Sequence, residues 1–287
     1  MHRFLPSLLL CAALAACGSP GGGSDTGRFE GAVGLQLYSL RNQIKTDGVE
    51  AVLDRVKAWG IREVELAGTY DLPPERFRAL LDQRGLVPVS GHFPYDRYKK
   101  DPEGVARDAK ALGLKFAGCA WINHTAPFSE AACREAAAVF NKAGEILARE
   151  GIRLFYHIHG YEFQPHGEGT LFDLFAKETR PEWVSLQLDV LWAFLPGQDP
   201  AALLRRFGPR WVSLHLKDLK KGVARGVMTG KTDVENDMVL GDGQMDWPAI
   251  LTAAREAGVK HYFIEDESSR STGQIPLSRR FLEELRW

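Results

Sequence analysis

Four apolar segments of this chain each end in a residue that could bind a metal ion. The segments and their last residues are 154–159 with His159, 184–189 with Asp189, 211–215 with His215, and 262–265 with Glu265. In a barrel of parallel strands, the carboxyl ends of all strands meet at one rim, where functional groups are delivered. Imidazole and carboxylate groups gathered at such a rim suit a divalent cation. The pattern therefore predicts a catalytic rim built around a metal ion.

The order of polar and apolar residues within these segments indicates which face they present. In residues 185–189 the polar residues Ser185, Gln187 and Asp189 alternate with leucines, and residues 213–217 repeat this alternation. Side chains two positions apart in a strand share a face, so the polar groups lie on one side. A single such segment could be an ordinary half-exposed strand. Four of them alternating with helices instead indicate a helix layer over the apolar face and a polar lumen on the other.

The three later segments supply most of a ligand set. Asp189, His215 and Glu265 close three consecutive predicted strands at the same relative height. Two carboxylates and one imidazole with open positions suit Mn, Zn, Co or Mg and exclude a soft thiolate site. A fourth ligand is expected from the preceding strand, where either His157 or Glu162 could supply it. The histidine pair of that strand could instead form hydrogen bonds at the rim without binding metal.

Length, composition and charge limit the class of protein. The chain has 287 residues, of which 45% are hydrophobic and 25% charged, enough for one large domain with a substantial core. Its formal net charge of -1 provides no basic surface for nucleic acid. Its four cysteines form no CxxC motif or zinc-type spacing, so neither a disulfide framework nor thiol chemistry is expected. Small-molecule chemistry is the favoured class.

The beginning of the chain predicts export. A short basic region precedes an apolar stretch at 4–16, which is shorter than the ~20 residues of a membrane-spanning helix and fits a signal peptide. The stretch ends in the sequence LAAC, which resembles the lipobox of bacterial lipoproteins. A lipoprotein-type signal peptide at 1–17 makes Cys17 the lipidation site, and the Gly/Ser-rich residues 18–30 follow as a flexible tether.

This leader places the mature protein outside the cytoplasm. A lipidated Cys17 would anchor it to a bacterial membrane facing the periplasm, and Gly18 at the next position favours the outer membrane. The alternative is a plain signal peptide that is cut nearby. The lipid anchor is the only membrane contact that we expect.

From residue 31 to 287 the chain alternates strand-like and helix-like segments, which implies parallel strands joined by right-handed crossovers. The predicted strands lie at 33–38, 62–66, 88–92, 116–120, 153–157, 184–189, 211–215 and 262–265. The predicted helices lie at 48–59, 74–84, 103–112, 129–150, 170–177, 200–207, 247–257 and 277–285. This count predicts one (β/α)8 TIM barrel of the α/β class. An open doubly wound sheet would need a GxGxxG turn near the first strand, and none is present.

One connection departs from the repeat. Residues 217–246 contain five glycines and little periodicity. A connection longer than ~15 residues in a compact domain is usually functional or disordered. Because this one follows the His215 strand at the predicted catalytic rim, we interpret it as a lid or a substrate-binding loop.

Seven short motifs occur together along the mature chain. They are GLQLYSLR at 34–41, VEL at 64–66, YHxHxxEF at 156–163, LDVxW at 188–192, HLKD at 215–218, GxGxxDW at 241–247 and IE at 264–265. With these motifs the chain resembles the xylose isomerase-like TIM barrel superfamily, in the branch called sugar phosphate isomerases/epimerases. The third to sixth motifs, taken together, are highly specific for this resemblance.

The resemblance implies one divalent ion at the ends of the fifth to eighth strands. Asp189, His215 and Glu265 match the ligands of the family directly. The first ligand of the family is often a glutamate, but His157 stands at that position here and Glu162 lies five residues further on. Either residue could complete the metal shell.

Other polar residues acquire roles around the ion. Glu65 and His92 end the second and third predicted strands, and the resemblance places substrate or proton handling at such positions. His92 or His159 could then act as acid or base beside the ion. All three residues are therefore candidate catalytic groups.

Two further residues at the predicted rim could have either a functional or a purely structural role. Lys217 could steady an oxyanion or a sugar hydroxyl, and it could equally form a salt bridge to Asp218 or Glu267. Trp192 could offer a flat wall to a sugar ring, although packing in the core or at the rim is the commoner role of tryptophan.

The leading functional hypothesis is a metal-dependent sugar isomerase or epimerase that removes a proton next to a carbonyl. The absence of a Lys/Arg cluster or a phosphate-cradling glycine loop argues against a phosphorylated substrate, so a sugar or keto-sugar is expected. The first alternative is a lyase or hydratase that cleaves 3-keto-glycosides through the same proton abstraction. The second is a sugar-binding lipoprotein without turnover. A DNA-repair nuclease on this barrel would need more histidine ligands and a basic groove.

Overall fold

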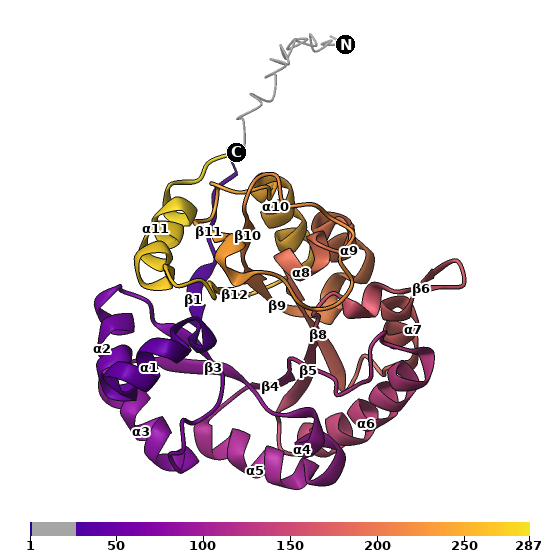
Figure 1. Cartoon of the computed structure of the whole chain (residues 1–287), viewed down its shortest axis with the longest axis horizontal. Helices are drawn as coiled ribbons and strands as arrows, with labels where there is room; N and C mark the ends of the chain where they lie inside the picture. Colours follow the sequence, from indigo (N-terminus) through magenta and orange to yellow (C-terminus); the bar gives the residue numbers. More distant parts are fainter. Residues whose placement is uncertain (2–26) are drawn as a thin grey trace.

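Eight parallel strands pair in the order β1-β12-β9-β8-β5-β4-β3-β2 and close into a barrel (Figure 1). The structure, a computed structural model, describes Met1 and residues 27–287. The barrel strands are β1 (Ala32–Gln36), β2 (Glu63–Leu66), β3 (Val87–His92), β4 (Phe116–Cys119), β5 (Arg153–His157), β8 (Val184–Asp189), β9 (Trp211–Leu216) and β12 (His261–Ile264). Every predicted strand is present, and the predicted (β/α)8 TIM barrel is confirmed.

Helices follow the strands and form the outer ring of the barrel (Figure 1). They are α1 (Arg41–Asp47), α2 (Val49–Ala58), α3 (Pro74–Arg84), α4 (Tyr95–Lys100), α5 (Pro102–Leu112), α6 (Glu130–Arg149), α7 (Leu171–Glu178), α8 (Val190–Phe194), α9 (Pro200–Phe207), α10 (Trp247–Ala257) and α11 (Ser271–Glu284). Side-chain caps start several of them. The Ser129 side chain accepts the N–H of Ala132 at the start of α6, and Asp199 precedes Pro200 at the first position of α9.

The helix predictions missed three short helices and placed the start of the last helix too late. The short helices α1, α4 and α8 were not predicted, because five to seven residues are too few to show a helical period. The last helix begins at Ser271 and not at residue 277. Proline disfavours a helix interior, but α11 carries Pro276 inside it. At the other end of the chain, the first strand stops at Gln36 because residues Leu37–Leu40 form a 3-10 turn.

The lumen of the barrel is polar, as the alternation in the strands predicts. Leu186 and Leu188 of β8 are fully buried in the apolar layer under the helices. Gln187 between them reaches Glu65 of β2, which lies on the opposite side of the closed sheet. Ser185 and Asp189 share its parity and are also fully buried. The inner faces of the strands therefore carry buried polar groups beneath the carboxyl-terminal rim, with the rings of Phe155 and Phe263 packed against the histidines among them.

The long connection after β9 is more ordered than its composition suggested. It contains the antiparallel pair β10 (Asp218–Leu219) and β11 (Asp237–Met238). The Asp218 carboxylate accepts the backbone N–H groups of Gly241 and Met245 and the indole N–H of Trp247. A Cβ at Gly243 would overlap this carboxylate, which explains the glycine there. The base of the loop is thus fixed, while residues 230–234 extend over the rim.

All of the predicted signal peptide after Met1, including the lipidation site Cys17, and most of the predicted tether 18–30 lie outside the described residues. The end of that tether is attached to the barrel, since Trp287 donates its backbone N–H to the Gly27 carbonyl at 2.9 Å. Within the part of the chain that the structure describes, none of the helices has the length and apolar character needed to span a membrane. Cys119 and Cys133 are buried free thiols.

Candidate metal centre and active site

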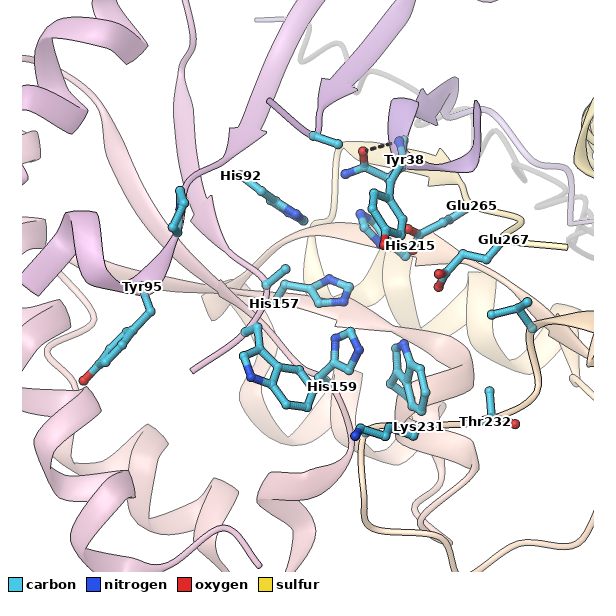
Figure 2. A pocket seen from close by; sticks show the side chains of 18 of the residues that line it. Tyr38, His92, Tyr95, His157, His159, His215, Lys231, Thr232, Glu265 and Glu267 are labelled. Atoms are coloured by element: carbon cyan, nitrogen blue, oxygen red, sulfur yellow. Dashed lines mark hydrogen bonds and ion pairs between the residues drawn. The ribbon is translucent and has the colours of Figure 1, made fainter. Parts of the chain in front are cut away.

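A cavity of about 690 Å³ opens at the carboxyl ends of the barrel strands. His92, His157 and His215 enter it from β3, β5 and β9, and Glu265 follows the end of β12 (Figure 2). Figure 2 shows these side chains converging on one region, with Tyr38 beside them. The cavity therefore lies where strand ends were expected to deliver the chemistry.

Three of the predicted metal ligands lie together at the bottom of this cavity. His215 Nδ1 lies 2.8 Å from Glu265 Oε2 and 3.8 Å from Asp189 Oδ2. The three groups offer ligand atoms that all lie within 4.8 Å of one another. Each residue is at most 7% exposed. The structure thus assembles one imidazole and two carboxylates at the ends of three neighbouring strands. Asp189 and His215 are paired in register, but Glu265 follows the end of β12 and lies two residues beyond Phe263, the partner of His215, so the predicted equal height of the three was wrong for Glu265.

Asp189 provides the test of whether this group fits a divalent ion. Its Oδ1 accepts the backbone N–H of Trp192 at 3.0 Å, whereas its Oδ2 is buried and has no hydrogen-bond partner. An unpartnered buried carboxylate oxygen is costly and needs an explanation. Burial raises the pKa of Asp189 to about 7. The nearby Glu265 carboxylate acts in the same direction, and the positive charge of Lys217 opposes the shift. A hard oxygen aimed at an imidazole and a second carboxylate is the donor set that borderline and hard divalent ions take.

His215 is held between two carboxylates. Its Nδ1 contacts Glu265, and its Nε2 contacts Oε1 of Glu65. Burial opposes the charged ring, but Glu265 and Glu65 outweigh it and raise the pKa of His215 to about 10. Binding a metal through Nδ1 requires that this nitrogen lose its proton. The N–H on Nε2 can keep its hydrogen bond to Glu65. This bond orients the ring, as carboxylates commonly do for metal-binding histidines.

The two candidates for the fourth ligand lie on opposite sides of β5. His157 Nε2 lies 4.0 Å from Asp189 Oδ2, beside the group, and His157 forms a second cluster of possible ligands with His92 and His215. Glu162 instead accepts the Tyr156 hydroxyl and the backbone N–H of His159, both at 2.8 Å. Because the Tyr156 ring packs against Phe140 of α6, this contact is on the helix side of the strand. The structure therefore brings His157 to the metal group and does not bring Glu162 there.

Glu65 forms the floor beneath the ligand group. This fully buried carboxylate accepts Gln36 Nε2 at 2.8 Å, Ser90 Oγ at 2.6 Å and Gln187 Nε2 at 2.8 Å, in addition to His215. Burial raises its pKa, but His92 and His215 hold the pKa of Glu65 well below its usual value. Gln36, Ser90 and Gln187 were not predicted as site residues. The inward parity of Gln187 beside Asp189 was the one signal that could have found it.

His92 and His159 line the cavity in different surroundings. His92 Nε2 lies 3.3 Å from both Glu65 Oε1 and Gln187 Oε1. The His159 ring stacks on Trp192 with centroids 4.6 Å apart. Burial, helped by the charge of Lys217, lowers the pKa of His159 to about 3, so this ring is neutral. Trp192 therefore acts as a wall of the cavity through its contact with His159.

Lys217 lies behind the ligand group in a buried cluster of carboxylates. Its Nζ is 2.6 Å from Glu267 and 3.7 Å from both Asp237 and Glu265. Burial opposes its charge, but Asp237, Glu265 and Glu267 raise the pKa of Lys217 well above its usual value. The salt bridge to Glu267 is thus present, while Asp218 instead fixes the loop. The geometry assigns Lys217 to charge balance at Glu265.

A closed (β/α)8 barrel with carboxylates and imidazoles at its carboxyl rim defines an enzyme of the TIM-barrel class. The chain belongs to the xylose isomerase-like TIM barrel family, which it matches over residues 53–287. The inosose dehydratase of Geobacillus kaustophilus is 24% identical over 243 residues, which cover 75% of this chain and 78% of that protein. The resemblance inferred from the motifs is confirmed, and the chain is an enzyme of this family.

Solved structures share this fold. A sugar phosphate isomerase/epimerase from Parabacteroides distasonis matches with a TM-score of 0.72 at 24% identity, covering 91% of this chain and 96% of that chain. The IolI protein, whose structure holds a zinc atom, matches with a TM-score of 0.68 at 14% identity, covering 88% of this chain and 95% of that chain. These matches establish the arrangement of strands and helices.

We predict that Asp189→Ala and His215→Ala each abolish stoichiometric binding of Zn²⁺ or Mn²⁺. Each change removes one ligand and leaves a poor site. Titration calorimetry and metal analysis after dialysis measure the loss, and circular dichroism checks the fold. His157→Gln and Glu162→Gln form a matched pair, of which only His157→Gln should weaken binding strongly. Tight binding retained by both alanine variants would contradict the assignment, and a loss confined to Glu162→Gln would place the fourth ligand there.

Proposed function

We propose that this protein is a divalent-metal-dependent enzyme that removes a proton next to the carbonyl of a sugar, in an isomerisation or epimerisation. The observation that carries this proposal is the unpartnered Oδ2 of Asp189, which is buried 3.8 Å from His215 Nδ1 and 4.0 Å from His157 Nε2. The family match and the structural similarity to a protein named sugar phosphate isomerase/epimerase support this proposal.

Asp189, His215, Glu265 and His157 would hold the ion in this proposal. When bound, a divalent ion supplies Lewis-acid polarisation of the carbonyl, which lowers the cost of removing the neighbouring proton. Zinc is supported by the zinc atom in IolI, and the mixed oxygen and nitrogen donors equally suit Mn, Co or Mg. All four residues are anchored by strand ends, so the shell is rigid before substrate arrives.

His92 is the proposed proton acceptor. Its ring lines the cavity next to His157, with centroids 5.5 Å apart, so it faces a substrate that the metal group holds. Glu65 contacts His92 Nε2 at 3.3 Å. Because Glu65 is a buried anion, it stabilises the ring when His92 takes a proton, as a carboxylate does for a catalytic histidine.

The rest of the cavity positions the substrate. Trp192 and Trp121 present flat apolar surfaces to the C–H face of a sugar ring. His159, held between these two rings, is neutral and can hydrogen-bond a substrate hydroxyl. Lys231 and Thr232 of the loop after β9 also line the cavity, and Lys231 lies close to His159 (Figure 2). We therefore keep the interpretation of this loop as a substrate-binding element.

A second candidate is elimination after the same proton abstraction. The inosose dehydratase of Geobacillus kaustophilus favours it, because dehydration expels a hydroxyl next to the carbanion centre. A 3-keto-glycoside would expel its aglycone in the same way. His159 lies on the cavity wall, where it could donate a hydrogen bond to the departing oxygen. Isomerisation and elimination therefore share His92 and differ in what happens after it acts.

We predict that His92→Gln lowers turnover by ~100-fold or more while metal content stays unchanged, as expected for loss of general base catalysis. Turnover of free ketoses and 3-keto-glycosides in deuterated water is followed by NMR and mass spectrometry. The native enzyme should place solvent deuterium in substrate or product. His166→Gln on the β6–β7 hairpin (Pro165–His166 and Gly169–Thr170) is the matched control and should keep full activity.

The sugar-binding alternative without turnover makes a different prediction. It requires that His92→Gln weaken sugar binding and that no deuterium exchange occur. Absence of exchange with every ketose and keto-glycoside tested, with metal restored, would overturn the enzymatic proposal.

We also propose that the protein is exported and anchored by lipid at Cys17, facing the periplasm, with the outer membrane favoured over the inner. The LAAC sequence at 14–17 supports this. In bacteria fed radiolabelled palmitate, the native chain should incorporate label, Cys17→Ser should lose it and leave the membrane fraction, and Cys11→Ser is the matched control. Label retained by Cys17→Ser would contradict the anchor.

A further inference from the structure

The side-chain amide of Gln187 contacts the floor carboxylate and two histidines of the cavity at once. Its Nε2 lies 2.8 Å from Glu65 Oε2 and 2.8 Å from Ser213 Oγ. Its Oε1 lies 2.8 Å from His157 Nδ1 and 3.3 Å from His92 Nε2. The residue is fully buried, so all of these contacts form without competition from solvent. No reaction step described above uses Gln187.

The orientation of this amide is determined by Glu65. An ionised carboxylate can only accept hydrogen bonds, so the end of the amide that faces it must be the NH₂ group. Ser90 Oγ and Gln36 Nε2 also donate to Glu65, and the oxygen of Gln36 is already occupied by the Tyr38 N–H, so both carboxylate oxygens act as acceptors. The exchange of oxygen and nitrogen that is otherwise ambiguous for glutamine is therefore excluded here. Oε1 must face the histidines.

The amide oxygen in turn determines where the histidine protons are. An amide oxygen only accepts, so the ring nitrogens that contact it must carry hydrogen. His157 therefore carries its proton on Nδ1, and the neutral form of this ring has no proton on Nε2. Its Nε2 is then a free lone pair, 4.0 Å from Asp189 Oδ2. A neutral His92 with its proton on Nε2 likewise keeps a free lone pair on Nδ1.

We propose that Gln187 is a positioning residue that selects the tautomers of both His157 and His92, giving His157 a metal-binding Nε2 and His92 a proton-accepting Nδ1. One buried amide thereby couples the fourth ligand to the base. The metal-binding role of His157 Nε2 rests on the proposed function. The two tautomers do not, because they follow from the hydrogen bonds alone. This role of Gln187 also explains how a neutral histidine can serve as the fourth ligand, since an outer partner orients its lone pair.

The tautomer can be measured directly in the metal-free native protein. Long-range ¹H–¹⁵N correlation spectra of ¹⁵N-histidine-labelled protein report which nitrogen of each ring is protonated, and His157→Gln assigns the His157 signals. We expect a single His157 species with its proton on Nδ1. Added Zn²⁺ should shift the Nε2 resonance while Nδ1 keeps its proton. A His157 ring protonated on Nε2 would overturn the inference. If His157 is protonated on Nδ1 but the protein binds no Zn²⁺, the tautomer inference holds and the proposed function is contradicted.

Gln187→Met tests whether the amide is the cause. This variant should populate both His157 tautomers and lower Zn²⁺ affinity by about 10–100-fold, as loss of an outer-sphere partner does. Gln36→Met is the matched control, because Gln36 also donates to Glu65 but contacts neither histidine. It should keep the single His157 tautomer. A single Nδ1-protonated His157 in Gln187→Met would show that another group selects the tautomer and would overturn the role of Gln187.

Discussion

The carboxylates of Glu65, Asp189 and Glu265 are buried in one lumen, and the site depends on how their charge is balanced. A buried ion pair from which one partner is removed typically costs about 3–5 kcal/mol, so such anions need cations or donors nearby. His215 lies between Glu65 and Glu265, and Lys217 lies next to Glu265. Asp189 keeps one oxygen without any partner. The chain's own cations therefore leave this lumen incompletely balanced at one point, and this is the physical reason for assigning a divalent ion there.

The same charge balance ties the substrate-binding loop to the ligand group. Lys217 contacts Asp237 of β11 as well as Glu265, and Glu267 accepts its closest hydrogen bond. Asp237 also accepts the backbone N–H of Glu267 at 2.8 Å. Movement of the loop over the rim would therefore disturb the charge next to a metal ligand. Loop position and metal affinity are expected to be coupled through Lys217.

The sequence was sufficient for the barrel and for the main ligand group, because both depend on local patterns. Strand parity and strand ends placed Asp189, His215 and Glu265 at one rim, and the structure shows them together. The choice between His157 and Glu162 could not be made, because Glu162 follows a turn at Gly160 whose φ of 90° sends the chain back onto β5. Contacts across the lumen, such as Gln187 with Glu65, depend on the register of strands far apart in sequence. The register between such distant strands cannot be predicted from a local sequence pattern.

Anomalous diffraction from crystals of the metal-loaded protein measures the position of the ion directly. We predict one strong peak at the metal's absorption edge, about 2.0–2.2 Å from His215 Nδ1, His157 Nε2 and oxygens of Asp189 and Glu265. Glu65 should remain outside this distance and in contact with His215 Nε2. A peak beside Glu162, or loaded protein with no peak at the barrel rim, would contradict it.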